Sequence, residues 1–323
     1  MSAEANEKEG SGRTETRKVA IVTGTSSGFG LHICIELAKA GAVVAAGMRK
    51  PEAAERLAEA AAQADREAGM SGDSGISLSG RGLEPLGGGP VSGLIRPFAL
   101  DVCDDARVTE AVRSVAETLG RIDILVNNAG MAMGGFIGDV PMDGWREQFA
   151  VNVFGLIAMT GAVLPYMREA GSGCILQMSS VSGAIGLPGY GPYVSSKFAI
   201  EGFSESLALE TAPYGIRTYV IEPASYKTEI WEKGFSGIHR SSGSPNGPAL
   251  ERMLEMSRAS AAGGGDPRDV ARLAVGLALG RRGRGRFRYV VPRGAALLVA
   301  LKKRLPFRLI QGIMLRILRR GMK

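Results

Sequence analysis

The sequence predicts an α/β protein, in which a single domain is built on a doubly wound parallel sheet and is followed by a basic amphipathic helical tail. Short β-branched runs alternate with amphipathic helical stretches over residues 18–292. The first run leads through a glycine-rich turn into a helix, and later runs also end in small or polar residues. Parallel strands carry their ligands at their carboxyl ends, so these residues belong to one edge of the sheet.

The composition is that of an ordinary globular protein. The chain has 323 residues, of which 45% are apolar and 22% charged, enough for a large buried core. The three cysteines and two histidines are scattered, so we expect no metal site and no disulfide framework, and a cytoplasmic location. Residues 1–17 are polar, which predicts a disordered leader and no secretory signal, and no apolar run is long enough to span a membrane.

The charge is divided unevenly along the chain. The net charge is +7, but residues 281–323 contain 14 Lys or Arg and no Asp or Glu, which leaves residues 1–280 with 25 basic and 32 acidic residues. An acidic body argues against a nucleic-acid-binding protein and draws attention to the tail.

The first strand and helix predict a dinucleotide-binding (Rossmann) βαβ unit. A β-branched strand over residues 18–23 is followed by a glycine-rich turn, a helix ending at Gly41 and a second strand over residues 42–47. We expect the helix start to hold the pyrophosphate of a cofactor. The alternative is a turn that only links a strand to a helix. The cofactor-binding candidates in this turn are Gly24, Ser26, Ser27, Gly28, Phe29 and Gly30.

The end of the second strand indicates which dinucleotide is bound. A 2′-phosphate calls for a cation there, whereas a free ribose hydroxyl calls for a carboxylate. Met48 is followed by Arg49 and Lys50, and no carboxylate occurs before Glu52. Arginine binds phosphate through a bidentate, charge-assisted fork, so we predict NADP(H). The alternative for Arg49 is a solvated surface side chain.

The next segment contains one irregular insertion. A helix over residues 51–69 precedes a Gly-, Ser- and Pro-rich stretch, residues 69–93, which we expect to be a flexible surface insertion. Further strands over residues 94–100 and 122–126, with a helix over 109–119 between them, end at positions facing the cofactor. The candidates at these two strand ends are Asp101, Val102, Asn128, Ala129 and Gly130.

A buried amide interrupts the following helix. The pattern over residues 142–168 predicts a long helix with a break near Asn152, which is a costly residue in the apolar middle of a helix. Its side chain either satisfies the backbone or holds an ordered water.

A strand over residues 173–179 ends in hydroxyl residues and leads toward a second helix. Tyr193 and Lys197 are four apart on that helix, which extends to about Tyr214, so they share one face. A nearby ammonium favours phenolate and lowers the pKa of the phenol toward that of a general acid/base for an alcohol/ketone pair. Ser180 is placed to donate a hydrogen bond to the same substrate oxygen. The alternative is a chance pair on an amphipathic helix.

The last part of the domain completes the sheet. A strand over residues 216–221 is followed by a polar loop, a mixed segment over 229–265 suited to a mobile substrate lid, a helix opened by Asp266, and a strand over 287–291. The cofactor candidates in the polar loop are Pro223, Ser225, Tyr226 and Thr228.

Taken together, these motifs resemble the short-chain dehydrogenase/reductase superfamily over about residues 18–292. The matches are Thr23-Gly24-x-x-x-Gly28-x-Gly30, Asp101-Val102, Asn127-Asn128-Ala129-Gly130, Asn152, Ser180, Tyr193-x-x-x-Lys197, and Pro223 with Thr228. The spacing of thirteen residues between Ser180 and Tyr193 is the usual one in that family. Two further segments, Gly186-Leu187-Pro188 and residues 196–202, resemble the hydroxysteroid and retinol dehydrogenase branch.

The resemblance implies roles for individual residues. Tyr193 is expected to be the proton donor and acceptor, Lys197 to lower its pKa and hold the nicotinamide ribose, Ser180 to orient the carbonyl, and Asn152 to support a water. Hydride transfer between the nicotinamide and the substrate carbon follows from the family chemistry. Ala224 departs from the pattern, which usually has glycine there, and this puts the contacts of the loop over 223–228 in doubt.

The tail, residues 293–323, combines apolar clusters with Lys and Arg. Pro306 separates two helical stretches, and in the second Leu309, Ile313 and Ile317 recur at helical spacing among arginines. A basic amphipathic helix without acidic residues suits an anionic membrane interface, so residues 294–320 are candidates for peripheral membrane contact. The alternative is that the apolar face covers the substrate pocket or a partner subunit.

From the sequence we therefore expect an NADP(H)-dependent oxidoreductase. It would interconvert a hydroxyl and a carbonyl on a small lipophilic substrate, such as a steroid, a retinoid or a long-chain molecule, and work as a homo-oligomer in the cytoplasm. Two alternatives remain at this stage: a catalytically silent dinucleotide-binding regulator or scaffold, and the same chemistry on a small polar substrate.

Overall fold

The computed structural model describes residues 17–70, 83–283 and 285–319. The leader expected over residues 1–17 therefore lies almost entirely outside the described residues, as do residues 71–82 of the insertion and 320–323 of the tail.

Seven parallel strands form one sheet in the described chain, in the order β3-β2-β1-β4-β5-β6-β7. The chain starts in the middle of the sheet, builds outward to β3, and then returns to build the other half. The order thus reverses between β1 and β4, which is where doubly wound sheets bind ligands. The strands are β1 (Val19–Thr23), β2 (Val43–Met48), β3 (Ile95–Ala99), β4 (Ile124–Asn127), β5 (Gly173–Met178), β6 (Ile216–Pro223) and β7 (Arg288–Val291).

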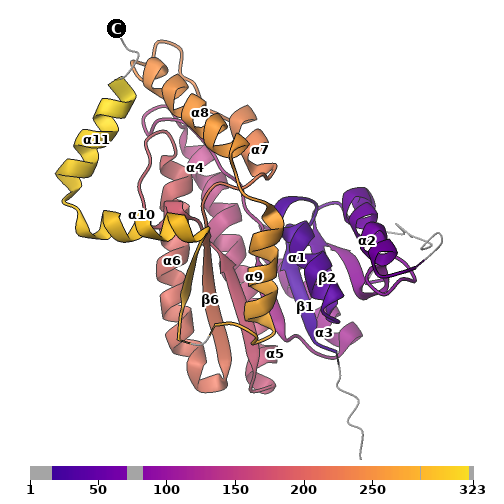
Figure 1. The fold of residues 1–323 in the computed structure, drawn as a ribbon. Coiled ribbons are helices and arrows are strands. Elements are labelled where there is room, and N and C mark those ends of the chain that lie inside the picture. Colours follow the sequence, from indigo (N-terminus) through magenta and orange to yellow (C-terminus); the bar gives the residue numbers. More distant parts are fainter. Residues whose placement is uncertain (1–16, 71–82, 284, 320–323) are drawn as a thin grey trace, which may run out of the picture.

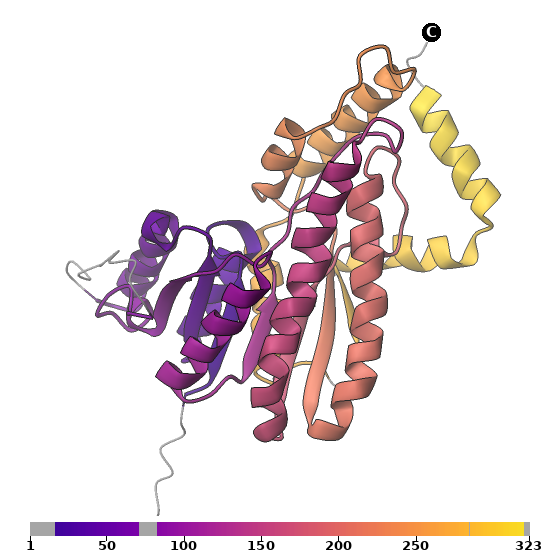
Figure 2. The same cartoon turned by 180° about the vertical axis from the view of Figure 1, so that it is seen from behind.

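Helices cover both faces of the sheet (Figures 1 and 2). One face carries α1 (Gly28–Lys39), α2 (Glu55–Glu67) and α9 (Pro267–Ala278), and the other carries α3 (Asp105–Leu119), α5 (Gly155–Glu169) and α6 (Gly191–Thr211). The remaining helices are α4 (Met142–Phe149), α7 (Ile230–Ser236), α8 (Gly247–Ala262), α10 (Arg293–Arg304) and α11 (Phe307–Arg319). Single turns lie at η1 (Pro51–Ala53), η2 (Ser92–Leu94), η3 (Ala150–Phe154), η4 (Val181–Gly183) and η5 (Ala212–Tyr214).

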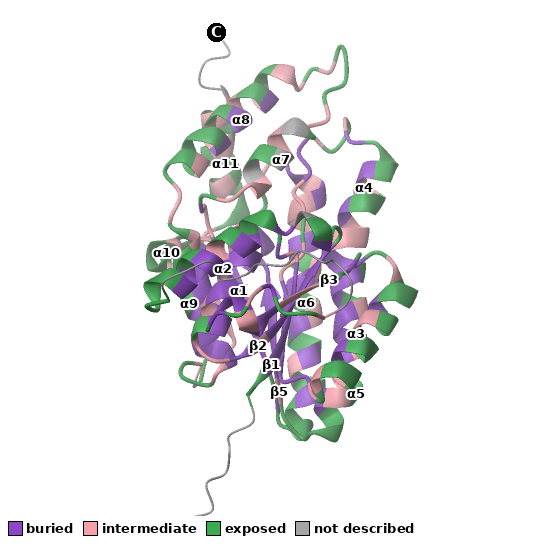
Figure 3. Cartoon of the chain, turned by 90° about the vertical axis from the view of Figure 1, so that its right-hand side faces the viewer, coloured by how far each residue is buried: buried purple, intermediate pink, exposed green. Residues whose placement is uncertain are grey.

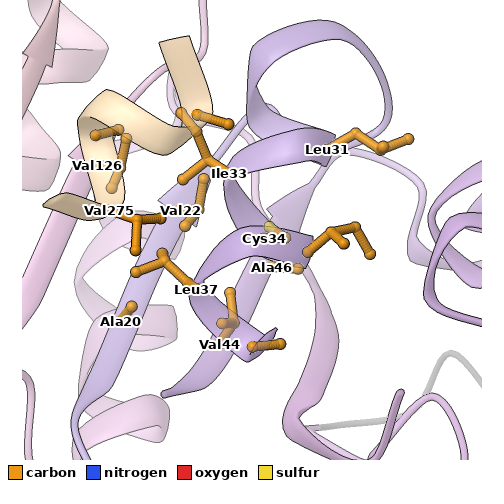
Figure 4. Close-up of a cluster of buried hydrophobic side chains, with 14 of the residues drawn as sticks. Ala20, Val22, Leu31, Ile33, Cys34, Leu37, Val44, Ala46, Val126 and Val275 are labelled. Carbon is orange, nitrogen blue, oxygen red and sulfur yellow. The ribbon is translucent and has the colours of Figure 1, made fainter. Parts of the chain in front are cut away.

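The core follows from the strand sequences. β1 is buried over its whole length, because its side chains meet helices on both sides. Figure 4 shows one of the two resulting layers, in which Ala20 and Val22 of β1 meet Ile33 and Leu37 of α1, with Val275 of α9 beside them. Figure 3 shows the same pattern for the whole chain, with buried residues concentrated in the sheet and exposed ones on the outer helix faces.

The long helix with a break near Asn152 is present as α4, one π-helical turn over Ala150–Phe154, and α5. By length and composition the stretch Met142–Glu169 could cross a membrane. However, Met159, Val163 and Met167 are fully buried in the layer beneath α5, so we describe it as a core helix.

The structure corrects the prediction of a flexible insertion for residues 83–93. Leu86 is buried, and its N–H donates to the carbonyl oxygen of Ile95 at 2.9 Å. The buried carboxylate of Asp65 accepts hydrogen bonds from the backbone N–H groups of Val91, at 2.7 Å, and Ser92. The Asp65 carboxylate on α2 thus accepts backbone hydrogen bonds that a helix or strand would otherwise satisfy, and it orders this stretch.

The segment over residues 229–265 contains α7 and α8, which lie above the carboxyl ends of the strands (Figure 1). It is tied to the body of the protein by a hydrogen bond of 2.9 Å from the phenol of Tyr190 to the Ser257 hydroxyl. The polar sequence of this segment therefore forms two helices that close one end of the domain. Two helices also follow β7, as the sequence predicts, and they meet at Pro306.

Candidate active site

The glycine-rich turn leaves β1 along a path that requires glycine. Gly24 and Gly28 have φ angles of 69° and 57°, in the left-handed region that other residues rarely adopt. A Cβ on Gly30 would lie 2.2 Å from the carbonyl oxygen of Gly24, so the first turn of α1 sits directly against the loop. The N-cap residue Ser27 makes no side-chain cap, which leaves the first N–H groups of α1 for a bound anion. This cradle fits the pyrophosphate of a dinucleotide.

Asn128 supports this turn from below. Its side-chain amide donates to the carbonyl oxygens of Thr23 and Gly24, both at 2.9 Å. The hydroxyl of Thr23 in turn accepts from the backbone N–H groups of Asn128, at 3.0 Å, and Ala129, at 2.9 Å. Asn128 therefore shapes the turn, and Ala129 lies against it, since a Cβ on Gly24 would be 2.8 Å from the Ala129 Cα.

Arg49 and Asp101 lie at the same edge of the site. Arg49 directly follows β2 and is exposed, as are Lys50 and Glu52. Burial and Asp101 raise the pKa of the Cys103 thiol, and the nearby Arg49 guanidinium partly offsets this rise. The Asp101 carboxylate accepts from the Cys103 N–H at 3.0 Å. The cation predicted for a 2′-phosphate is therefore exposed to solvent at this corner.

Val102 and Gly130 follow β3 and β4, respectively, and each lies close to the π-helical turn or the start of α5. Val102 is buried against α5, where a Cβ on Gly155 would lie 2.7 Å from its Cγ2. A Cβ on Gly130 would lie 3.4 Å from the Asn152 side-chain oxygen. Val102 therefore packs against the start of α5, and Gly130 lies beside the Asn152 side chain.

The predicted catalytic residues converge at the carboxyl ends of β5 and β6. Ser180 follows β5, and its hydroxyl accepts from the Ser182 N–H at 3.1 Å and donates to the Pro223 carbonyl oxygen at 3.4 Å. The Ser180 hydroxyl also lies beside the phenol of Tyr193, which is half-buried on α6, and lowers the pKa of that phenol. Two hydroxyl groups therefore face one position, as binding of a carbonyl or alcohol oxygen requires.

The pKa of Tyr193 departs from the prediction. Burial raises it above its usual value, and the hydrogen bond with Ser180 only partly offsets this rise. The Lys197 ammonium lies 5.6 Å from the centroid of the Tyr193 ring and donates to the Met178 carbonyl oxygen at 2.8 Å. Burial also lowers the pKa of Lys197 to about 8, against the opposing effect of Glu201. The lysine is thus adjacent to the phenol, but the pKa of Tyr193 is set by burial and by Ser180.

Asn152 is held by the protein itself. Its side-chain oxygen accepts from the Met131 N–H at 2.8 Å, and its amide nitrogen donates to the Met131 carbonyl and the Ser196 hydroxyl, both at 3.0 Å. The Ser196 hydroxyl donates to the Tyr193 carbonyl oxygen at 2.7 Å. The amide therefore satisfies the backbone of Met131 and links the π-helical turn to α6, and its binding of an ordered water stays a prediction.

The loop after β6 contacts both the glycine turn and α8 of the lid segment. Thr228 faces the glycine turn, since its Cβ would be 3.5 Å from a Cβ on Gly28. Tyr226 is buried, and its ring packs edge-on against Phe29 at 5.5 Å between centroids. The Ser225 hydroxyl hydrogen-bonds Ser260 of α8. The side chains of Phe29 and Tyr226 therefore pack the glycine turn against this loop, and the side chain of Ser225 links the loop to α8.

Ala224 fits this loop without displacing it. Its N–H donates to the Val291 carbonyl oxygen at 2.8 Å and so extends the pairing of β6 with β7.

An ionic cluster beneath the site was not predicted. Glu201 lies one turn beyond Lys197 on α6, and Glu222 directly precedes Pro223; both are buried. Arg288 of β7 donates through Nε to Glu201 at 2.8 Å, and the same Nε lies 3.6 Å from Glu222. The available signal was the spacing of Glu201 from Lys197, which places a carboxylate on the buried face of α6.

The comparisons with known proteins agree with this geometry. The family model described as short chain dehydrogenase matches residues 18–74 and 89–238. The chain belongs to the short-chain dehydrogenase family. It is an NAD(P)-dependent oxidoreductase of that family, as its glycine turn and its Ser180, Tyr193 and Lys197 positions indicate.

Similar proteins in the short-chain dehydrogenase family cover most of the chain. The uncharacterized oxidoreductase YusZ of Bacillus subtilis is 39% identical over 300 residues, which are 92% of this chain and 97% of that protein. A 3-ketodihydrosphingosine reductase of Bacteroides thetaiotaomicron is 33% identical over 211 residues, 66% of this chain and 65% of that one. A short-chain dehydrogenase/reductase of Burkholderia phymatum, solved in complex with NAD, has a TM-score of 0.69 and 25% identity, and covers 88% of this chain and 92% of its own. These matches support the family and do not favour its hydroxysteroid and retinol dehydrogenase branch.

Proposed function

We propose that this short-chain dehydrogenase uses NADP(H) to interconvert a hydroxyl and a carbonyl group on a lipophilic substrate, such as a steroid, a retinoid or a long-chain molecule. The observation that carries the proposal is that the Ser180 hydroxyl lies beside the Tyr193 phenol, whose pKa it lowers, at the edge of the sheet where the glycine turn lies. When bound, the dinucleotide supplies or accepts the hydride.

The residues of the chain handle the proton and the orientation of the substrate. The Ser180 hydroxyl donates a hydrogen bond to the substrate oxygen, and the Tyr193 phenol exchanges a proton with that oxygen. Because burial raises the pKa of Tyr193, the phenol is protonated at neutral pH and is set to donate to a carbonyl. Lys197 lies one helical turn after Tyr193 on α6, and its ammonium donates to the Met178 carbonyl oxygen. In this position the ammonium can also bind ribose hydroxyls.

Apolar side chains around the entrance support a lipophilic substrate. Ile137 is 71% exposed, yet its Cγ1 would lie 2.9 Å from a Cβ on Gly191, two residues before Tyr193. Met142, nearby in the sequence, is also exposed, and Phe136 lies close to Gly189 in the loop that leads to α6. The name 3-ketodihydrosphingosine reductase, carried by one relative, is consistent with a keto group on such a substrate.

Arg49 supports the choice of NADP(H). It is exposed at the end of β2, at the position where NAD-specific sites carry a carboxylate. We expect Arg49→Ala to weaken NADPH binding at least about tenfold, because a charge-assisted fork to phosphate is lost, and to leave NADH binding nearly unchanged. Dissociation constants from cofactor fluorescence would measure both effects, with Arg113→Ala on α3 as the matched control. Equal losses for the two cofactors would refute the assignment.

Replacing Tyr193 tests the enzymatic proposal itself. Tyr193→Phe should keep NADPH binding and reduce kcat by roughly a hundredfold or more, since general acid catalysis contributes on that scale. NADPH consumption would be screened over lipophilic and small polar ketones and aldehydes. Full activity in the variant would exclude the proton role, turnover of polar substrates alone would favour the second substrate class, and no turnover of any substrate by the wild type would favour a silent scaffold.

We also propose a homo-oligomer in a reducing cytoplasm. Phe154 and Ile157 are exposed one helical turn apart at the start of α5, which is the kind of apolar face that a second subunit covers. Cys34, Cys103 and Cys174 are free thiols, which suits a reducing compartment. Light scattering of the wild type and Phe154→Ser would test the subunit contact.

A further inference from the structure

Exposed apolar side chains concentrate in the C-terminal arm, which we define as α10 and α11. Seven of the fifteen large hydrophobic residues that are exposed in the described parts of the chain lie in these two helices. They are Leu297, Leu298, Leu301, Phe307, Leu309, Ile313 and Leu315. Single exposed hydrophobic residues are ordinary, whereas a group of this density marks an interaction site.

The first helix of the arm has an inner and an outer side. Val299 is 6% exposed on the inner side, while Leu297 and Leu301 are 73% and 50% exposed. Leu297 and Leu301 are one turn apart, and Leu298 lies beside them, so the three leucines form one ridge directed away from Val299. In the folded chain this ridge faces solvent, and so it does not cover the substrate site of its own subunit.

The second helix continues the surface. α11 contacts α8, and its partly covered residues Ile310, Met314 and Ile317 share one face. Leu309 and Ile313 are exposed one turn apart, and Arg308 and Arg316 lie next to them on the helix surface. Figures 1 and 2 show the two helices as an angled arm beside α6 and α8.

The charge of the arm is of one sign. No Asp or Glu occurs from Arg281 to the end of the chain, and the exposed Arg304 and Arg308 follow Leu301 and Phe307 closely in the sequence. Residues 1–280 carry 25 basic and 32 acidic residues, so the C-terminal part of the chain, which includes the arm, is the part that an anionic surface attracts.

We propose that the C-terminal arm docks the protein on an anionic lipid bilayer. Exposed leucines and a phenylalanine, with basic residues and no acidic ones on the same helices, are the features that bind a helix in the plane of a charged membrane. A second copy of the arm fits less well, because a symmetric contact places like charges opposite each other. The proposal concerns where the protein binds, and it stands whether or not the substrate is lipophilic.

Vesicle flotation of the full-length protein tests the proposal. Wild-type protein should float with phosphatidylcholine vesicles that contain phosphatidylserine, much less with pure phosphatidylcholine, and less at high salt, because surface charge is screened. Leu297→Ser/Leu298→Ser/Leu301→Ser should reduce binding at least about tenfold, since each leucine contributes apolar contact. Reversing the charges with Arg304→Glu/Arg308→Glu/Arg316→Glu should reduce it at least about 100-fold, because each basic residue near the surface contributes about fivefold.

Matched controls separate docking from other effects of the substitutions. Leu209→Ser removes an exposed leucine from α6, and Arg113→Glu reverses an exposed charge on α3, so neither should change flotation. Circular dichroism would show that each variant is folded. Equal flotation by wild type and both arm variants would overturn the proposal, as would binding to neutral and anionic vesicles alike. Loss of oligomers in light scattering without any vesicle binding by the wild type would assign the arm to a second subunit instead.

Discussion

Glu222 gives the sharpest test of the electrostatics beneath the active site. It is 2% exposed near the end of β6, and the charged groups that face it are Glu201 of α6, Arg288 of β7 and Lys303 of α10. The Arg288 guanidinium is shared, because it bonds Glu201 and Glu205 and lies 3.6 Å from Glu222. The Oε2 atom of Glu222 has no hydrogen-bond partner among the described residues. A buried carboxylate with so little compensation is costly to ionise.

Burial therefore raises the pKa of Glu222 from 4.5 to about 7; Glu201 adds to the rise, and Arg288 and Lys303 oppose it. The folded state holds this proton more tightly than the unfolded state does. The stabilising contribution is thus fully present below the ordinary pKa and is lost as the pH rises through about 7. At about 1.36 kcal/mol per pKa unit, the loss between these limits is about 3 kcal/mol.

Replacing Glu222 with glutamine removes the ionisation but keeps the size of the side chain. The free energy of unfolding would be measured by urea titration at pH 5 and at pH 8 for the wild type and for Glu222→Gln. Other titrating groups cancel when the two proteins are compared at each pH. We expect the stability of the wild type relative to the variant to fall by about 3 kcal/mol between the two pH values. The same difference at both pH values would refute this reasoning, and Glu210→Gln, which alters an exposed carboxylate on α6, serves as the control.

Two further substitutions test the turn and the ordered part of the insertion. Gly30→Ala places a Cβ 2.2 Å from the Gly24 carbonyl oxygen, so calorimetry should show dinucleotide affinity reduced at least about tenfold. Gly202→Ala on α6, where the added Cβ has open space, is the control and should not reduce the affinity. Retained affinity in Gly30→Ala would contradict the close packing of the turn. Asp65→Ala removes the acceptor of the Val91 and Ser92 N–H groups and should lower the free energy of unfolding by about 1–3 kcal/mol in thermal or urea titrations. Glu59→Ala, at an exposed position of α2, is the control. An unchanged midpoint in Asp65→Ala would show that residues 83–93 contribute little to stability.

Much of the fold could be predicted because the signals for it are local. The apolar pattern and the glycine spacing predict the strand over residues 18–23 and the helix that follows. The structure confirms them as β1 and α1. The helix opened by Asp266 is present as α9, with the Asp266 carboxylate accepting from the Arg268 N–H at 2.9 Å. A parallel sheet also brings the ends of its strands to one edge, so Ser180 and Tyr193 could be expected to meet.

Other features depend on groups that lie far apart in the sequence. Asp65 orders residues 83–93 across more than twenty residues, and Arg288 reaches Glu201 across 87. The direction of the Tyr193 pKa was wrongly predicted for the same reason, because spacing on a helix identifies a neighbouring charge but not the burial that opposes it.

By itself the sequence determined the order of strands and helices and placed the candidate site residues at the ends of strands, since these follow from periodicity and short-range spacing. Only the tertiary structure decided the strength of the charges at the site and the direction of the apolar faces. Desolvation depends on everything packed around Glu222 and Lys197. The sides of α10 and α11 that face solvent likewise depend on where β7 and α8 lie beside them.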